Sequence, residues 1–348
     1  MVMSRSSGGA SAQAVTALRR IAYLLEADLA PTYRVTAFRR AADVVAGLDP
    51  GELDRRVGTG TLTALKGIGD TTAAVIAQAA SGEVPEYLAR LQAQAPERPV
   101  AGADLVAAQR GDLHAHTAWS DGGSPIEDMA VAATELGHEY LAITDHSPRL
   151  TVANGLTAQR LRDQLSVIES LNATGAGAHL LTGIECDILA DGTLDQSPEL
   201  LAQLDVVVAS VHSDLRADSR TMTRRMLAAI AHPATAILGH CTGRRLIGPR
   251  GNRPPSTFDA AAVFAACAEH GVAVEINSRP ERLDPPKALL AQAMQAGCLF
   301  AINTDAHAPG QLDWQYRGCA RAAECGVPVD RIVTAWPLDR LLAWLNRS

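Results

Sequence analysis

The chain has 348 residues, of which 47% are hydrophobic and 20% are charged, and its formal net charge at pH 7 is -7. This length suits two domains or one barrel with an appendage, and no apolar run approaches the roughly 18 residues of a membrane span. The N-terminus lacks the apolar core of a secretory signal, so we expect a soluble cytoplasmic protein with no membrane partner. The acidic balance does not indicate a protein that binds nucleic acid over its whole surface.

Charge and cysteine are unevenly distributed along the chain. The first 100 residues carry 11 basic and 10 acidic side chains, whereas the remaining residues carry 20 and 28. The first part is the better place for an anionic partner, and the acidic second part suits metal cations. All six cysteines lie in the second half without a CxxC pair, which favours reduced, buried thiols over disulfides or a zinc ribbon.

Residues 11–90 alternate helical periodicity with glycine turns, and no strand-like run occurs among them. Apolar residues recur there at three- and four-residue spacing, which predicts amphipathic helices. The positions are Val15, Leu18, Ile21, Leu24 and Leu25, then Val35, Phe38, Ala42 and Val45, then Ala73, Ile76 and Ala77. The sequence therefore predicts a small all-α domain over residues 11–93, and the aperiodic run after it predicts a linker over residues 94–107.

From residue 108 onward, short β-branched runs alternate with helical stretches rich in Ala and Leu. The seven runs span residues 111–116, 140–144, 179–185, 205–211, 235–239, 272–277 and 299–304. Apolar strands that are each followed by a helix are typical of a parallel sheet buried on both faces. Seven such units predict an α/β fold, a (β/α)7 barrel over residues 108–348.

Potential metal ligands stand at the ends of these strands. The carboxyl ends of the strands in a β/α barrel meet at one face, so residues far apart in the sequence are expected to converge there. His114 and His116 lie two apart on one strand and point the same way, and Asp121 follows in the loop. The later strand ends supply His146, Glu185, His212, His240, Asp305 and His307.

Imidazole and carboxylate ligands without thiolate suit zinc, manganese or iron. Nine ligands exceed the needs of one ion, and a carboxylate such as Glu185 can bridge two. Bound ions lower the pKa of water to near 7, so a metal-bound hydroxide is the expected nucleophile. The arrangement favours phosphoester hydrolysis, with amide or C–N hydrolysis as the alternative.

Arginine side chains follow two of the strand ends. They are Arg244, Arg245, Arg250 and Arg253 in residues 239–253, and Arg279 and Arg282 in residues 278–286. Guanidinium groups match phosphate oxygens, so these residues are candidate phosphate contacts, Arg244 and Arg279 first. A solvated basic loop is the alternative for each of them.

The order of the strand-end motifs resembles that of the PHP (polymerase and histidinol phosphatase) domain. Between residues 108 and 345 the chain carries DLHAHTAWSDG, ITDHS, GIECDI, SVHS, ILGHCTGR, EINSRPERLD and NTDAH, most similar to the C-terminal domain of bacterial family-X DNA polymerases. The resemblance implies a distorted seven-stranded barrel with three divalent ions, zinc or manganese, with iron as a further alternative. Carried over by motif, the nine residues named above are the ligands, whereas Asp145 and Asp187 contact the ligands rather than the ions.

The first domain resembles the N-terminal helical domain of the same polymerases. The matching segments are YRVTAFRRAADVVAGL and LTALKGIGDTTAAVIAQAASGEVPEYLARL, and the second contains a helix-hairpin-helix motif. Gly67 and Gly69 allow a tight turn whose backbone N–H groups bind a DNA phosphate, with Lys66 as a further contact. A plain glycine turn between helices is the alternative for this motif taken alone.

Two departures from the polymerases limit the expected activities. About ten linker residues replace the polymerase core, so nucleotide polymerisation is not expected. Val75 stands where related lyase domains carry a Schiff-base lysine, so 5′-deoxyribose phosphate lyase activity is not expected either.

We therefore expect a metal-dependent phosphoesterase that acts at DNA ends in DNA repair, as a 3′–5′ exonuclease or a 3′-phosphatase. One alternative is a phosphatase for a small metabolite such as histidinol phosphate. The other is a non-catalytic DNA-binding scaffold.

Overall fold

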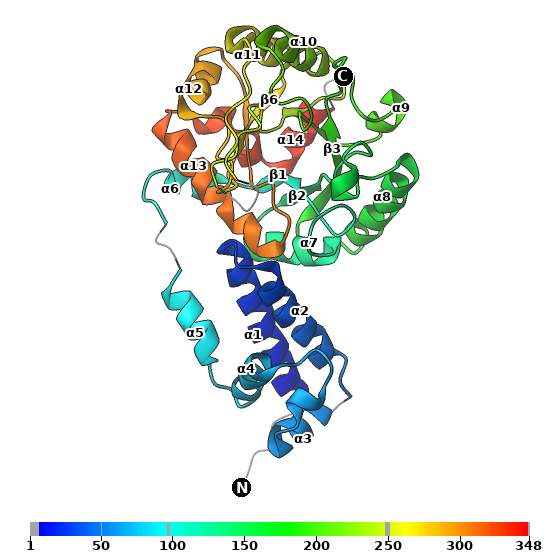
Figure 1. Cartoon of the computed structure of the whole chain (residues 1–348), viewed down its shortest axis with the longest axis vertical. Helices are drawn as coiled ribbons and strands as arrows, with labels where there is room; N and C mark the ends of the chain where they lie inside the picture. Colours follow the sequence, from blue (N-terminus) through cyan, green and yellow to red (C-terminus); the bar gives the residue numbers. More distant parts are fainter. Residues whose placement is uncertain (1–6, 50, 96–97, 248–250, 347–348) are drawn as a thin grey trace. The chain divides into compact units, whose positions relative to one another are not determined.

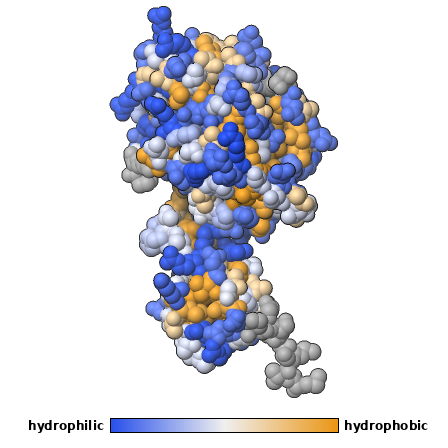
Figure 2. All heavy atoms as spheres, turned by 90° about the vertical axis from the view of Figure 1, so that its right-hand side faces the viewer, coloured by the Kyte–Doolittle hydropathy of each residue, from blue (hydrophilic) through white to orange (hydrophobic). Residues whose placement is uncertain are grey.

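The computed structural model describes residues 7–49, 51–95, 98–247 and 251–346. The chain divides into two compact units, residues 1–97 and 98–348, each with its own hydrophobic core (Figure 1). No helix among the described residues is long and apolar enough to cross a membrane. Figure 2 shows hydrophilic and hydrophobic residues interspersed over the face in view.

The first unit consists of helices only, as far as the structure describes it. They are α1 (Ser7–Ala27), α2 (Thr32–Ala46), α3 (Glu52–Thr59), α4 (Asp70–Ala80) and α5 (Glu86–Ala93), with a 3-10 turn at Leu62–Ala64. The periodic apolar residues form the core: Leu18 and Ile21 of α1 pack in one cluster with Phe38 of α2 and Ile76 of α4. The prediction of a small all-α domain at the N-terminus is confirmed.

The segment predicted as a linker, residues 94–107, is partly ordered in the second unit. Helix α6 (Ala103–Ala108) lies within it and buries Leu105 in the core of the second unit. Gly102 precedes this helix with a φ of +79°, and a Cβ there would lie 2.6 Å from the backbone of Cys319. The linker is therefore shorter than predicted, because an apolar anchor and a close backbone approach hold its second half.

The second unit is built on seven parallel strands in sequence order. They are β1 (Gly111–Ala115), β2 (Tyr140–Ile143), β3 (His179–Asp187), β4 (Val206–Ser210), β5 (Ile237–Leu238), β6 (Ala273–Asn277) and β7 (Phe300–Asn303). The backbone N–H of His116 donates to the carbonyl of Ala306 (2.7 Å), which joins the end of β1 to the segment after β7. The sheet is thus a nearly closed barrel, as predicted.

Helices surround this barrel (Figure 1). They are α7 (Ile126–Glu135), α8 (Ala158–Asn172), α9 (Pro198–Leu201), α10 (Ser219–Ile230), α11 (Ala260–His270), α12 (Lys287–Gln295), α13 (Gln315–Glu324) and α14 (Leu338–Leu345). Alternation along the strands positions the site: Leu181 and Glu185 of β3 share one face, and Leu181 packs in an apolar cluster with Val208 and Trp336. Glu185, near the carboxyl end of β3, therefore lies above that apolar cluster.

Candidate metal centre

Five histidines from four strand ends form a closed circle of neighbouring rings. The centroids of neighbouring rings lie between 4.4 and 5.9 Å apart. The ring of His307 lies beside two of them, 4.3 Å from His116 and 6.3 Å from His146. In order around the circle they are His114, His116, His146, His212 and His240, and we call them the histidine circle. The carboxyl ends of β1, β2, β4 and β5 therefore converge, although these residues span 127 positions of the sequence.

Glu185 lies among the five members of the histidine circle. One of its carboxylate oxygens is within 2.8 to 3.6 Å of a ring nitrogen of every member. Its side chain is 1% exposed, so the negative charge is shielded from water by imidazoles on all sides. A carboxylate in this position can serve several cations at once.

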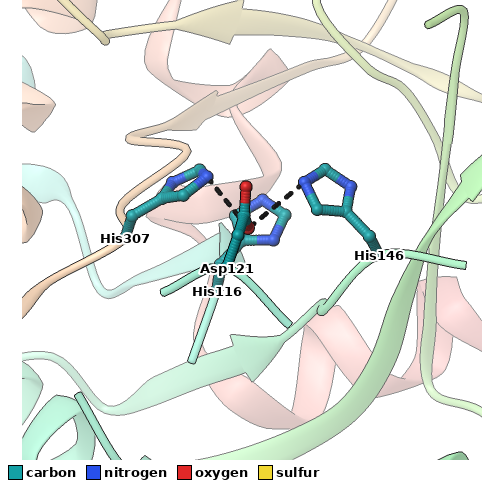
Figure 3. A group of neighbouring side chains, drawn as sticks. All are labelled: His116, Asp121, His146 and His307. Atoms are coloured by element: carbon teal, nitrogen blue, oxygen red, sulfur yellow. Dashed lines mark ion pairs between the residues drawn. The ribbon is translucent and has the colours of Figure 1, made fainter. Parts of the chain in front are cut away.

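A second group of ligands extends from the circle toward solvent (Figure 3). Oδ1 of Asp121, in the loop after β1, lies 3.5 Å from Nε2 of His146 and 3.4 Å from Nε2 of His307. His116 completes this group, and one ligand atom from each of the four lies within 4.8 Å of the others. Asp121 is the most exposed of the nine predicted ligands, with 36% of its side chain accessible.

Asp305 reaches the centre from the segment after β7, beside the end of β1. Its Oδ1 lies 3.5 Å from Nε2 of His116, and Nδ2 of Asn277 donates to its Oδ2 at 3.1 Å. The backbone of Asp305 is left-handed, with a φ of +54°, a conformation that Asp tolerates better than most residues. That turn directs the carboxylate back toward the histidine circle.

The nine predicted residues thus come together at one end of the barrel. Among the described residues, three overlapping groups of ligand atoms, which share His116 and His146, are each compact enough to hold a cation. They are His116, Asp121, His146 and His307; His114, His116 and Asp305; and His146, Glu185 and His212. His240 stands outside these groups, but its Nε2 lies 2.8 Å from Oε1 of Glu185.

Buried ring nitrogens and carboxylate oxygens in this centre lack hydrogen-bond partners. The atoms are His114 Nε2, His116 Nδ1 and Nε2, His146 Nδ1, Glu185 Oε1 and Oε2, His212 Nε2, and His240 Nδ1 and Nε2. Leaving such atoms unpaired costs about 1–3 kcal/mol each, and a bound cation would satisfy several of them at once. The donor set is nitrogen and oxygen without sulfur, and it fits divalent cations.

The charge states of the centre also suit cations. Burial and the neighbouring imidazoles of His307 and His146 lower the pKa of His116 to about 3, so the ring stays neutral and one of its nitrogens keeps a lone pair for a cation. Burial opposes ionisation of Glu185, but the surrounding histidines hold the pKa of that carboxyl well below its usual range. Burial alone would lower the pKa of His212, yet Glu185 and a hydrogen bond with Asp187 raise it to about 9.

Carboxylates behind the centre orient its ligands. Asp187 hydrogen-bonds Nδ1 of His212, which leaves Nε2 of that ring facing the centre. Asp145 accepts hydrogen bonds from the backbone N–H (2.8 Å) and hydroxyl (2.6 Å) of Thr117, and so fixes the start of the loop that carries Asp121. Both acids therefore contact ligands or their loop.

The sequence reasoning missed Glu275 on β6, which is fully buried. Its Oε1 lies 2.6 Å from Nδ1 of His114, and its Oε2 accepts from the backbone N–H of His240 at 2.7 Å. Amide donors of Asn277 (3.1 Å) and Asn303 (3.0 Å) complete its hydrogen bonds. The sequence did carry a signal for Glu275, which is the only acid within the apolar run VAVEIN. A charged residue in a buried strand needs a partner, so this acid could have been predicted to bind another site residue.

A cavity of about 400 Å³ opens above the centre. Its lining includes the ligands Asp121, His146, His212, Asp305 and His307. Leu150, Val152 and Ala153 form an apolar part of the wall, and Arg245, Arg253, Arg279 and Arg282 form a basic part. The cavity therefore offers an anion-binding wall and an apolar wall beside the metal ligands.

Some of the arginines predicted to contact phosphate line the cavity, and others do not. Arg279 and Arg282 line the cavity, as do Arg245 and Arg253. Arg244 does not: its guanidinium donates to the backbone carbonyls of Arg282 (3.0 Å) and Leu283, so the prediction for Arg244 is corrected. Arg250 lies outside the described residues.

The predicted hairpin in the first unit lies between the 3-10 turn and α4. Gly67 has a φ of +100° and Gly69 is the N-cap of α4, with its N–H paired to the hydroxyl of Thr72 at 3.0 Å. Lys66 is exposed beside them. Val75 is buried in the core of the first unit.

Two family descriptions match this sequence. Residues 112–279 match the PHP domain, and residues 10–83 match a helix-hairpin-helix domain. The match to the first covers the strands that carry seven of the nine predicted ligands.

Relatives of two kinds match about two thirds of the chain. The chain is 38% identical over 239 residues to "DNA polymerase/3'-5' exonuclease PolX" of Bacillus subtilis, which covers 69% of this chain but only 41% of that protein. It is 31% identical over 247 residues to "Probable phosphatase NT01EI_1577" of Edwardsiella ictaluri, covering 68% of this chain and 94% of that protein. A crystal structure of histidinol phosphate phosphatase from Lactococcus lactis aligns with 19% identity and a TM-score of 0.46, over 63% of this chain and 94% of that one.

Proposed function

Because the chain belongs to the PHP domain family and is a metal-dependent phosphoesterase, we propose that it hydrolyses phosphoester bonds at DNA ends during DNA repair. The reaction is that of a 3′–5′ exonuclease or a 3′-phosphatase. One observation carries the proposal: a helix-hairpin-helix domain and the centre around Glu185 occur in the same chain. The relative in Bacillus subtilis, which is named as a 3′–5′ exonuclease, supports the same choice.

The first unit is proposed to hold the DNA backbone. The positive φ of Gly67 and the N-cap position of Gly69 bring the chain sharply into the start of α4. Helix N-termini carry partial positive charge and suit phosphate, and the exposed Lys66 adds a full charge beside the turn. Contacts of this kind fix the position of the DNA but do not read its sequence.

The second unit is proposed to bind three divalent ions, zinc or manganese, with iron as a further alternative. Nine converging ligands, which form three overlapping groups, support more than one ion, and the nitrogen and oxygen donors support that choice of metals. Bound divalent ions activate water and neutralise charge that develops on a phosphoryl group. Glu185 is the proposed bridging carboxylate because it lies close to all five members of the histidine circle.

The surrounding residues of the chain are proposed to hold and orient these groups. Glu275 and Asp187 each bind one nitrogen of a histidine and so direct the other nitrogen toward the centre. Arg279, in the cavity wall, donates to the carbonyl of Asp305 at 2.8 Å and is the proposed contact for oxygens of the reacting phosphate.

A small-molecule phosphatase is the second candidate. The relatives named as probable phosphatases support it, since the match covers 94% of the Edwardsiella ictaluri protein. All nine predicted ligand positions hold competent side chains, so no observation favours a non-catalytic scaffold.

The test compares DNA and small substrates with the full chain. The purified protein in manganese or zinc is given 5′-labelled single-stranded DNA, the same strand with a 3′-phosphate, p-nitrophenyl phosphate and histidinol phosphate. We expect turnover at the DNA 3′ end that disappears in the H114A/H116A variant. Turnover of histidinol phosphate with no effect on either DNA strand would establish the second candidate instead.

A further inference from the structure

Two arginines in the cavity wall face each other across a short backbone ladder. The N–H of Arg245 donates to the carbonyl of Arg253 at 2.9 Å, and the N–H of Arg253 donates back at 2.8 Å. Residues paired in this way across antiparallel backbone project their side chains to the same face. Both side chains line the cavity that contains His146 and His212.

The four arginines of the cavity wall differ in how their charge is balanced. Arg279 binds Glu281 (2.8 Å), and Arg282 binds Asp305 (3.1 Å). Within the part of the chain that the structure describes, no ion pair joins Arg245 or Arg253 to a carboxylate. Among the described residues, two of the four guanidinium groups therefore have no carboxylate in direct contact.

This arrangement works against the fold. Like charges directly opposite each other on paired strands are destabilising. Burial and repulsion from Arg282 and Arg245 lower the pKa of Arg253 to about 10. Nε of Arg253 is fixed by the carbonyl of Gly243 at 2.6 Å, which leaves its terminal nitrogens available. An anion held between the two guanidinium groups would remove the repulsion.

We propose that Arg245 and Arg253 form a binding site for a second phosphate of the substrate, one that does not react. This inference rests on the proposed function, since a nucleotide chain presents a second phosphate beside the reacting one. The metal ligands and Arg279 serve the reacting phosphate, and the arginine pair binds the next phosphate along the strand. The pair thereby makes the site prefer a DNA strand over a substrate with a single phosphate.

The test uses substrates that differ by one phosphate. TpT carries only the reacting phosphate, whereas TpTpT carries one more, and the 3′-phosphorylated pair Tp and TpTp serves a 3′-phosphatase in the same way. The full-length wild type and R245Q/R253Q are compared by the ratio of kcat/KM for the longer substrate to that for the shorter one. The matched control is R220Q/R224Q, which removes two exposed arginines of α10 that do not line the cavity.

We expect the ratio to fall about tenfold or more in R245Q/R253Q, mainly through KM, and to stay at the wild-type value in the control. R245K/R253K, which keeps both charges, should give an intermediate ratio. Equal losses on both substrates, or no loss on either, would overturn the second-phosphate site while leaving the proposed function intact. A wild type that hydrolyses p-nitrophenyl phosphate but none of the four nucleotides would overturn both.

Discussion

The two units carry their candidate functions in different kinds of groups. In the second unit, buried side chains from distant strand ends meet around Glu185, and their identity decides the chemistry. In the first unit, an exposed turn at Lys66, Gly67 and Gly69 offers backbone groups and one cation. Substitutions in the second unit should therefore act on catalysis by orders of magnitude, whereas substitutions in the first should act on binding and local stability.

The largest effect is expected from Glu185→Gln. The substitution keeps the shape of the side chain but removes the negative charge that five histidines surround, so several kcal/mol of metal binding should be lost. Turnover should fall about a thousandfold or more. Glu169→Gln, an exposed acid on α8, is the matched control and should leave the rate unchanged. Comparable rates for the two variants would refute the central place given to Glu185.

A smaller loss is expected from Glu275→Gln. Glu275 holds Nδ1 of His114, and partners of this kind typically change metal affinity or activity about 10- to 100-fold. Metal affinity, measured by calorimetry, should fall with turnover, and the melting temperature of the metal-free protein should fall as well, because the buried amide of Gln would face hydrogen-bond donors. A lower melting temperature with unchanged metal affinity would show that Glu275 serves only the core.

Metal binding should strengthen as the pH rises from 7 to 9. The pKa of His212 is raised to about 9, so this imidazole binds a proton at pH 7 that must leave before its nitrogen binds a cation. Affinity should increase about tenfold per pH unit for each proton released. Calorimetry in buffers of different ionisation enthalpy counts those protons. An affinity that is constant over this range would contradict the assigned role of His212.

The smallest effect is expected in the first unit. In Gly67→Ala, the positive φ and a Cβ 2.8 Å from Cδ of Arg40 should cost roughly 1–2 kcal/mol of local stability. Gly58→Ala is the control, because a Cβ there meets nothing within 4 Å and the residue lies in helix α3. Hydrogen exchange of the α4 amides reports stability, and fluorescence anisotropy reports affinity for DNA. Gly67→Ala should weaken DNA binding without changing turnover of p-nitrophenyl phosphate; an equal loss of both would break the division of roles.

The fold and the convergence of the ligands could be predicted because both follow from side-chain types in order along the chain. Strands that alternate with helices fix a barrel, and a barrel fixes where His114 and Asp305 must meet. Glu275 was not predicted because its strand is apolar apart from this residue and its partners come from other strands.

The conformation of loops was the second feature that the sequence did not predict. Whether Arg244 or Arg245 faces the cavity depends on the ladder with Arg253, which no local pattern in the sequence indicates. In the same way, α6 forms because Leu105 finds a place in the distant core, although its surroundings read as a linker.

Metal stoichiometry tests the central claim most directly. The purified full-length chain is dialysed against manganese or zinc, and bound metal is measured by elemental analysis beside H114A/H116A. The account predicts about three ions per chain in the wild type and fewer in the variant. A wild type that retains no divalent ion would contradict it.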